Sequence, residues 1–307
     1  MSQKTYNADS ITVLKGLEPV KQRPGMYTRT EHPLHVIQEV IDNAADEAMA
    51  GFCKKIGVTL HLDGSISVSD DGRGIPVETH PVEGVSTVEV VFTRLHAGGK
   101  FNKTDEDSAY RFSGGLHGVG VSVTNALSHR LEVEVVRDGA RHKLVFSGGD
   151  VIEPLTRIGD APKKASGTSV RAWPDAKYFD APELPRAELE RLLRSKAVLM
   201  PGLEVSLAIE GGETRSWHFE HGMRGYLSEA LNDEPLIPLF AGEKFAPKGD
   251  DTFAAGEGAS WAVAWTLEGS PVRESYVNLI PTPAGGTHEA GLRDGIFTAI
   301  KNFIDHH

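Results

Sequence analysis

The chain has 307 residues, of which 39% are hydrophobic and 24% are charged. This composition supports one large or two ordinary folded domains and excludes a chain that is disordered throughout. Its 32 lysines and arginines against 43 aspartates and glutamates give a net charge of −11, which disfavours sequence-independent binding of this chain alone to a nucleic-acid backbone.

The sequence shows no sign of export or membrane insertion. No stretch approaches the roughly 18 to 20 consecutive apolar residues of a membrane helix, and residues 1–33 lack the basic-then-apolar layout of a signal peptide. The one cysteine, Cys53, excludes an internal disulfide and fits a reducing compartment. We therefore expect a cytoplasmic chain that does not associate with membranes.

Residues 1–33 form a polar arm, and the first long helix is predicted over residues 35–50, ending at Gly51. Alternating runs at residues 55–61 and 65–69 meet at an Asp-Gly pair and predict a hairpin. Another Asp-Gly turn joins the strands predicted at 131–137 and 141–146. The remaining predicted elements are helices near residues 87–95, 121–127 and 186–198 and strands at 167–173 and 203–209.

A second unit is predicted to begin near Phe219. Its pattern is helical at the last residue, His307, so we expect this domain to be truncated. Interleaved helices and hairpins together predict an α+β fold with a mixed sheet. The elements expected in this unit are a helix at residues 223–231, a loop at 235–258, strands at 260–267 and 274–280, and a helix from Glu289.

Four polar residues of the first long helix, His35, Glu39, Asn43 and Asp46, fall within about 80° of one another on its surface. An amphipathic helix with a solvated polar face explains this pattern. Alternatively the row faces a ligand, in which case Glu39 is a candidate general base oriented by His35, and Asn43 offers a neutral oxygen to Mg²⁺.

The end of the first hairpin carries Asp70-Asp71-Gly72-Arg73-Gly74-Ile75-Pro76. A tight turn accounts for these residue types. The functional alternative makes Asp70 a hydrogen-bond acceptor in a pocket, while the glycines let the backbone approach a flat ligand. Thr168, in the later strand, is a candidate for the floor of the same pocket.

Residues 113–120 contain four glycines in seven residues just before a helical run. A flexible hinge is one interpretation, and a phosphate cradle made of converging backbone N–H groups is the other. Neither a Walker A loop nor a G-x-G-x-x-G fingerprint is present. Lys100, which follows two glycines, is a candidate positive charge for the same phosphates.

The order of these motifs resembles that of the GHKL ATPases. RPGMY, EVIDNAADEA, DDGRGIPV, LHAGGKF, SGGLHGVGVSVTNALS and GTSVRAWPD are similar to type IIA topoisomerase B subunits, and YVNLIPTPAGGTHEAGLR resembles their transducer domain. Two segments favour the topoisomerase IV B subunits (ParE) over the B subunits of gyrase: the opening sequence TYNADSITVLKGLEPVKQRPGMYT and the sequence QEVIDN.

This resemblance implies a Bergerat-type sandwich, with a mixed sheet and helices on one face, over residues 1–217, including an N-terminal dimerisation arm. A truncated α/β transducer domain would follow over residues 218–307. The resemblance also implies ATP and Mg²⁺ as cofactors and an ATP-hydrolysing type IIA DNA topoisomerase as the enzyme, performing strand passage, decatenation and relaxation. The B subunit of gyrase, or another GHKL nucleotide-gated clamp of the chaperone or mismatch-repair type, remains the alternative.

Roles follow at matching positions. Glu39 would activate the water that attacks the γ-phosphate, His35 would support it, and Asn43 would hold the Mg²⁺. Asp70 would accept from the adenine amino group, with Thr168 nearby. The full expected ATP-binding set is Tyr6, Asn43, Asp46, Glu47, Asp70, Arg73, Gly74, Ile75, Lys100, Tyr110, Gly114, Gly115, Leu116, His117, Gly118, Val119, Gly120, Val121 and Thr168.

The resemblance further implies partners. Tyr6 would reach the nucleotide of a second protomer, so that ATP binding closes a dimer. The complete enzyme would be an A2B2 heterotetramer with the A subunit of topoisomerase IV (ParC), would act on DNA, and would bind ATP-site inhibitors of the aminocoumarin type. Because the family's Gln-Thr-Lys loop and Toprim domain are missing, we expect weak ATPase activity, and the acidic segment 102–109 is longer than the family's usual lid tip.

Overall fold

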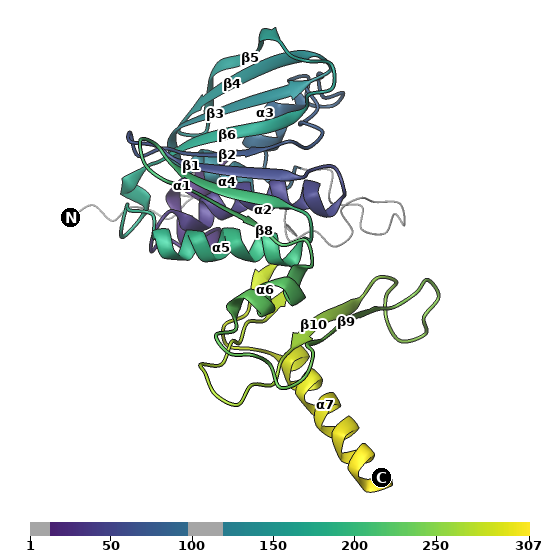
Figure 1. Ribbon diagram of the computed structural model, residues 1–307. Helices are drawn as coiled ribbons and strands as arrows, with labels where there is room; N and C mark the ends of the chain where they lie inside the picture. Colours follow the sequence, from purple (N-terminus) through teal and green to yellow (C-terminus); the bar gives the residue numbers. More distant parts are fainter. Residues whose placement is uncertain (1–12, 98–118) are drawn as a thin grey trace, which may run out of the picture. The chain divides into compact units, whose positions relative to one another are not determined.

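The computed structural model describes residues 13–97 and 119–307 (Figure 1). The chain forms two compact units. The first takes in the chain up to Leu193 together with Glu204–Ser216, and the second comprises Arg194–Leu203 and Trp217–His307. Among the described residues, none of the helices combines the length and the apolar character needed to cross a bilayer.

The first unit is built on an eight-stranded sheet with the order β5-β4-β3-β6-β2-β1-β7-β8. β1 and β7 are parallel, whereas β1–β2, β2–β6, β3–β6, β3–β4 and β4–β5 are antiparallel, which confirms the predicted mixed sheet. The strands are β1 (Lys55–Leu60), β2 (Ile66–Asp70), β3 (Ser128–Arg137), β4 (Ala140–Ser147), β5 (Asp150–Asp160), β6 (Gly167–Pro174), β7 (Glu204–Ile209) and β8 (Thr214–His218).

Helices pack on one face of this sheet, as the GHKL resemblance implied. α2 packs on β1 and β2, α3 on β5, and α4 on β3 and β6. The helices of this unit are α1 (Glu18–Gln22), η2 (Pro24–Met26), α2 (Leu34–Met49), α3 (Thr87–Thr93), α4 (Gly120–Ala126), η3 (Ala176–Tyr178) and the start of α5 (Arg186–Leu199).

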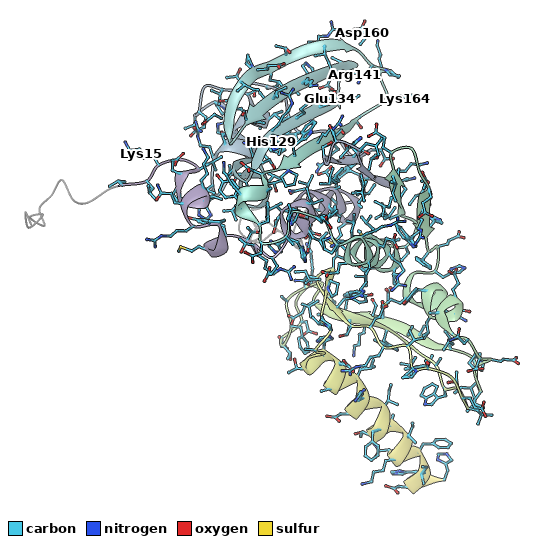
Figure 2. The ribbon with its side chains drawn as sticks, turned by 90° about the vertical axis from the view of Figure 1, so that its left-hand side faces the viewer. Lys15, His129, Glu134, Arg141, Asp160 and Lys164 are labelled. Atoms are coloured by element: carbon cyan, nitrogen blue, oxygen red, sulfur yellow. The ribbon has the colours of Figure 1, made fainter. Side chains whose placement is uncertain are left out.

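The alternation of side chains along the strands explains this one-sided arrangement. Leu131, Val133 and Val135 of β3 have exposed fractions of 0% on the helix side, whereas residues between them are charged and face the other side. Glu134 forms an ion pair with Arg141 of β4 there, at 3.0 Å (Figure 2). The polar face therefore needs no covering helix.

Two strands of the first unit were not predicted. β5 and β8 lie at the two edges of the sheet, and most of their residues are exposed. An edge strand with little buried surface lacks the alternation of apolar and polar residues by which strands are recognised. The Asp138-Gly139 turn is as predicted, with positive φ angles of 52° and 79°.

The second unit contains α6 (Gly222–Ala230), β9 (Phe240–Phe245), β10 (Gly258–Val263), β11 (Tyr276–Val277), β12 (Ile280–Pro281) and α7 (Thr287–His306). The loop predicted at 235–258 was wrong, because β9 lies within it and pairs with β10. The strand predicted at 274–280 is instead a tight hairpin. Asn278 and Leu279 take φ angles of 48° and 67°, and a left-handed leucine is not predictable from sequence.

Candidate functional site

The first turn of α2 places His35 in a partly buried position. Its Nδ1 lies 2.7 Å from the hydroxyl oxygen of Thr28. Burial lowers the pKa of His35, and the nearby charge of Arg29 lowers it further. The imidazole is therefore kept neutral at pH 7.

Glu39, one turn further along α2, meets the start of α4. A Cβ placed on Gly120 would lie 2.0 Å from Glu39 Oε2 and 2.8 Å from its Cδ. Thr124 holds the two helices in this relation, because its hydroxyl donates to the carbonyl of Val36 at 2.7 Å. Glycine at position 120 thus leaves the space that the Glu39 carboxylate occupies.

The next two turns of α2 carry the other polar residues of the row. Asn43 Nδ2 donates to the carbonyl oxygen of Glu39 at 2.9 Å, which turns the amide oxygen of Asn43 away from that carbonyl. Asp46 is almost completely buried, with an exposed fraction of 1%. The Glu47 carboxylate accepts hydrogen bonds from Nε and Nη2 of Arg73, at 3.1 and 2.9 Å. This bidentate pair joins α2 to the loop after β2.

Asp70, the last residue of β2, carries a partly buried carboxyl group. It accepts from the backbone N–H of Gly72 at 2.9 Å. Burial raises its pKa to about 6, and repulsion from Glu47 and Asp71 adds to the shift. A carboxyl group with a raised pKa is typical of a functional site.

Asp71, the neighbouring residue, has a structural role. Its Oδ1 accepts from the backbone N–H groups of Lys54 and Lys55 at 2.7 and 2.9 Å, where β1 begins. Of the two adjacent carboxyl groups, Asp70 therefore belongs to the candidate site, whereas Asp71 stabilises the loop beside it.

The loop after β2 closes over the start of β6. Thr168 pairs with Asp70 across the two strands, and its hydroxyl accepts from the backbone N–H of Ile75 at 3.3 Å. Gly74 has a φ of +75°, and a Cβ there would lie 2.8 Å from the carbonyl oxygen of Val136. A side chain at position 74 would prevent this close approach.

One site residue was missed from the sequence. Arg137, at the end of β3, donates from Nη1 to the carbonyl oxygen of Gly74 at 2.9 Å. The sheet order places β3 beside β6, and the register pairs Val135 with Thr168. No local sequence pattern predicts that β3 pairs with β6. The position of Arg137 beside an Asp-Gly turn does not indicate a contact with Gly74 either.

The structure thus brings the predicted residues into two groups along α2. In the first group, Glu39 lies against Gly120, the first residue of α4. In the second, Glu47 lies about 12 Å from Glu39 along α2 and pairs with Arg73 in the loop after Asp70. The predicted residues outside the described part of the chain are Tyr6, Lys100, Tyr110, Gly114, Gly115, Leu116, His117 and Gly118.

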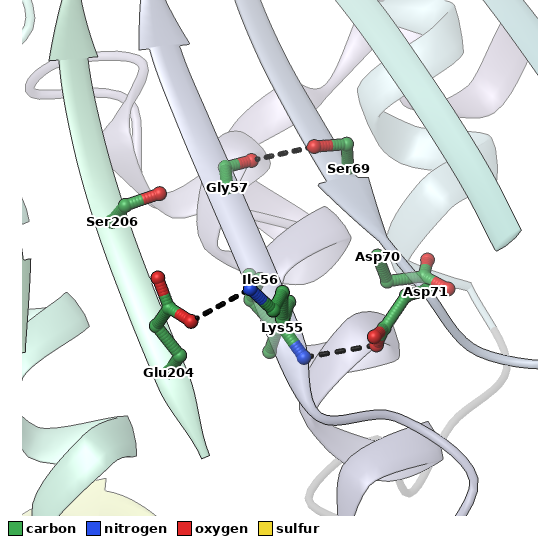
Figure 3. Close-up of a pocket in the computed structure, with 8 residues that line it drawn as sticks. All are labelled: Lys55, Ile56, Gly57, Ser69, Asp70, Asp71, Glu204 and Ser206. Carbon is green, nitrogen blue, oxygen red and sulfur yellow. Dashed lines mark hydrogen bonds and ion pairs between the residues drawn. The ribbon is translucent and has the colours of Figure 1, made fainter. Parts of the chain in front are cut away.

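A separate pocket borders Asp70 on the other side of the sheet (Figure 3). Gly57, Ser69 and Ser206 line it from three neighbouring strands, and Lys55 and Glu204 form an ion pair of 2.9 Å at its rim. The helices lie behind the strands in this view. No residue of α2 or α4 lines this pocket, so it is distinct from the site beside Glu39.

The described residues contain no metal site that is made of side chains alone. Among residues 13–97 and 119–307, no three or more His, Cys, Asp or Glu side chains are grouped to hold a metal ion. An Mg²⁺ ion that binds nucleotide phosphates and water needs only one or two protein oxygens. The Asn43 amide oxygen is of the required kind.

Two protein families match the chain. The family described as histidine kinase-, DNA gyrase B- and HSP90-like ATPase matches residues 28–177. The family described as DNA gyrase B matches residues 222–307.

Similar proteins come from several bacteria. The B subunit of DNA topoisomerase 4 from Pseudomonas aeruginosa is 50% identical over 305 residues, covering 98% of this chain and 47% of that protein. Its counterpart in Escherichia coli is 49% identical, covering 99% of this chain and 47% of that protein. The DNA gyrase B subunit of Thermotoga maritima is 43% identical, covering 98% and 47%. The chain therefore spans about half the length of the curated relatives it matches.

Two solved structures share the fold. The topoisomerase IV ATP-binding domain of Francisella tularensis, solved with a small-molecule inhibitor, has a TM-score of 0.74 and 44% identity, covering 96% of this chain and 76% of that one. The 43K ATPase domain of Thermus thermophilus gyrase B, solved with an aminocoumarin, has a TM-score of 0.66 and 34% identity, covering 76% and 60%. The chain therefore belongs to the family of GHKL-type ATP-binding domains found in the B subunits of topoisomerase IV and gyrase.

Proposed function

We propose that this chain is the ATP-binding and ATP-hydrolysing module of a type II DNA topoisomerase of the topoisomerase IV kind. The observation that carries this proposal is the contact between the Glu39 carboxylate and the backbone at Gly120. It puts a candidate general base at the point where the glycine-rich segment enters α4, and phosphates would be held there.

Glu39 accepts a proton from the attacking water, and its carboxylate stays beside the γ-phosphate because Gly120 makes room for it. His35, neutral and one turn away, supports Glu39 by hydrogen bonding. Lys100 and residues 114–121 hold the phosphates. Catalysis of this kind depends on positioning and on charge stabilisation.

The Asp70 carboxylate accepts a hydrogen bond from the adenine amino group, because an ionised carboxylate is a strong acceptor. Thr168 lies opposite it, and the backbone at Gly74 and Ile75 forms one wall of the adenine site. The Glu47–Arg73 pair fixes the rim, while Asp46 and Tyr110 complete the predicted set.

Asn43 is the proposed protein ligand of Mg²⁺, through its amide oxygen. Its side-chain nitrogen is engaged by the Glu39 carbonyl, so the oxygen is the atom presented elsewhere. The ion, when bound, neutralises phosphate charge and orients the phosphates. Residues 13–97 and 119–307 offer no side-chain cage that would compete with this arrangement.

The relatives support a proposal for the larger assembly. Residues 1–217 would be the ATPase domain and 218–307 part of a transducer domain. ATP binding would close a dimer through Tyr6, and the complete cytoplasmic enzyme would join the A subunit of topoisomerase IV (ParC) in an A2B2 heterotetramer acting on DNA. Aminocoumarin-type inhibitors would bind the ATP site, and the gyrase B ATPase domain that shares this fold was solved in complex with an aminocoumarin.

Calorimetry with a non-hydrolysable ATP analogue and Mg²⁺ tests the proposal on the 307-residue chain. We expect micromolar to millimolar binding that Asp70→Asn weakens at least tenfold, since an acceptor becomes partly a donor. A matched Asp63→Asn change, in the β1–β2 turn, leaves binding unchanged. Absence of binding, or equal binding by Asp70→Asn, contradicts the proposal.

Gyrase remains the second candidate, because the gyrase protein of Thermotoga maritima reaches 43% identity. The topoisomerase IV B subunits of Pseudomonas aeruginosa and Salmonella typhimurium reach 50% and 48%. Two chimeras separate the two candidates: this chain replaces the matching half of the Pseudomonas aeruginosa topoisomerase IV B subunit in one, and of the Thermotoga maritima gyrase B subunit in the other. ATP-dependent decatenation with ParC supports the first candidate, and supercoiling with the partner subunit of gyrase supports the second.

A further inference from the structure

A threonine outside the predicted site holds the ring of His35. The Thr28 hydroxyl oxygen lies 2.7 Å from His35 Nδ1, and Thr28 has an exposed fraction of 9%. Its backbone N–H donates to the carbonyl of Pro24 at 3.0 Å. Two residues later, the carbonyl of Thr30 accepts from Asp180 at 2.9 Å. The hydroxyl is therefore presented to the ring from a backbone that is fixed on both sides.

The acceptors within reach of the Thr28 hydroxyl indicate which partner donates. A hydroxyl carries one proton, and Nδ1 accepts it only when the ring proton lies on Nε2. If Nδ1 carried the proton, the hydroxyl would need another acceptor, and the carbonyl of Arg29, at 3.4 Å, is at the outer limit for one. The hydroxyl proton therefore has its shortest contact, 2.7 Å, when Thr28 donates to an unprotonated Nδ1.

We infer that Thr28 is a positioning residue that fixes His35 as the neutral tautomer with its proton on Nε2. An imidazole in this form presents a donor and not a base on the ring edge away from Thr28. The inference rests on the proposed ATPase function. In that function His35 would stabilise the Glu39 carboxylate or the attacking water by donating a hydrogen bond, and it would leave proton abstraction to Glu39.

The surroundings of the ring agree with a neutral form. His35 stands in the first turn of α2, where the helix dipole disfavours a cation. Burial and the charge of Arg29 lower its pKa, while Asp42 and Glu31 act in the opposite direction. A neutral ring has one N–H, and the contact with Thr28 decides which nitrogen carries it.

Nitrogen-15 NMR of the histidine-labelled chain measures the tautomer directly, with the His35 signal assigned by its loss in His35→Asn. We expect a protonated-type shift at Nε2 and an unprotonated-type shift at Nδ1. In Thr28→Val the preference is lost and the two shifts move towards each other, and Thr28→Ser restores it. A parent protein with its proton on Nδ1, or a Thr28→Val variant with an unchanged spectrum, overturns the inference.

Thr93→Val is the matched control. Thr93 is buried to the same degree, at 8% exposed, and its hydroxyl donates to the carbonyl of Glu89 at 2.7 Å. The change removes a comparable buried hydroxyl and leaves the His35 spectrum as in the parent. An equal spectral change in Thr93→Val would mean that the effect of Thr28→Val is a general loosening of the fold, which contradicts the inference.

Kinetics then test the link to the reaction. We expect Thr28→Val to lower kcat about tenfold, which corresponds to about 1.4 kcal/mol, with KM for ATP within twofold. In a His35→Asn background the same change has no further effect, because Thr28 acts through that ring. Equal losses in both backgrounds contradict the inference. A chain without any ATPase activity contradicts the proposed function, whereas the tautomer is still decided by the NMR spectrum.

Discussion

Gly120 and Glu39 are joined by a contact that leaves no room for a side chain: a Cβ on Gly120 would stand 2.0 Å from Glu39 Oε2. Gly120 is the first residue of α4 and Glu39 lies in the middle of α2. Because Gly120 has no Cβ, α4 leaves the space that the Glu39 carboxylate, the proposed base on α2, occupies.

Gly120→Ala should separate activity from stability. Alanine favours a helix over glycine by up to about 1 kcal/mol, and the closest clash is with the far end of a flexible side chain. We expect the free energy of unfolding to change by less than about 1 kcal/mol, while the displaced Glu39 carboxylate lowers ATP turnover at least about tenfold. Steady-state ATPase assays and urea denaturation measure the two effects.

Gly159→Ala is the control for this change, since Gly159 has a negative φ and nothing within 4 Å of an added Cβ. It should alter neither turnover nor nucleotide binding. Full turnover in Gly120→Ala would show that the position of the Glu39 carboxylate is not important for hydrolysis.

Replacing the proposed base itself gives a second test. Glu39→Ala should keep the dissociation constant for a non-hydrolysable ATP analogue within a few-fold and reduce turnover to the background rate, because the group acts on water and not on the bound nucleotide. Calorimetry and a phosphate-release assay measure the two quantities. A large loss of affinity would instead assign Glu39 a structural role.

The sequence was sufficient to predict the helix and the strand end that carry the candidate site residues. The spacing of His35, Glu39 and Asn43 defined one helix face, and the hairpin placed Asp70 at a strand end. The Arg137–Gly74 contact, however, depends on the order of strands in the sheet. The Thr28–His35 contact depends on how the arm folds back onto α2. Long-range contacts of this kind have no local periodicity, so sequence patterns do not predict them.

The single cysteine should serve as a probe of folding. Cys53 has an exposed fraction of 6%, and burial raises the pKa of its thiol to about 12. At pH 8 roughly one thiol in ten thousand would be the reactive thiolate. We expect a thiol reagent to label the native chain over hours and the urea-unfolded chain within seconds. Stoichiometric labelling of the folded chain within seconds would show that this part of the structure opens readily.

Asp70 should make the stability of the chain depend on pH. Its pKa is raised to about 6 in the folded chain from an ordinary value of 3.8. Between these values the folded state binds more protons than the unfolded state, so the free energy of unfolding falls as the pH rises. The difference between these two pKa values corresponds to about 3 kcal/mol. Asp70→Asn should therefore have the parent's stability near pH 4 and exceed it by up to about 3 kcal/mol at pH 8.

Asp71→Asn is the matched control, with the opposite sign. The hydrogen bonds from Lys54 and Lys55 help to lower the pKa of Asp71, although its partial burial acts the other way. Its contribution to stability is therefore fully present above pH 4 and is lost only at lower pH. Denaturation at pH 5 and pH 8 should show a constant loss for Asp71→Asn and a growing gain for Asp70→Asn. A gain for Asp70→Asn that is the same at both pH values would mean that the Asp70 carboxyl titrates normally and that its burial is not what distinguishes it.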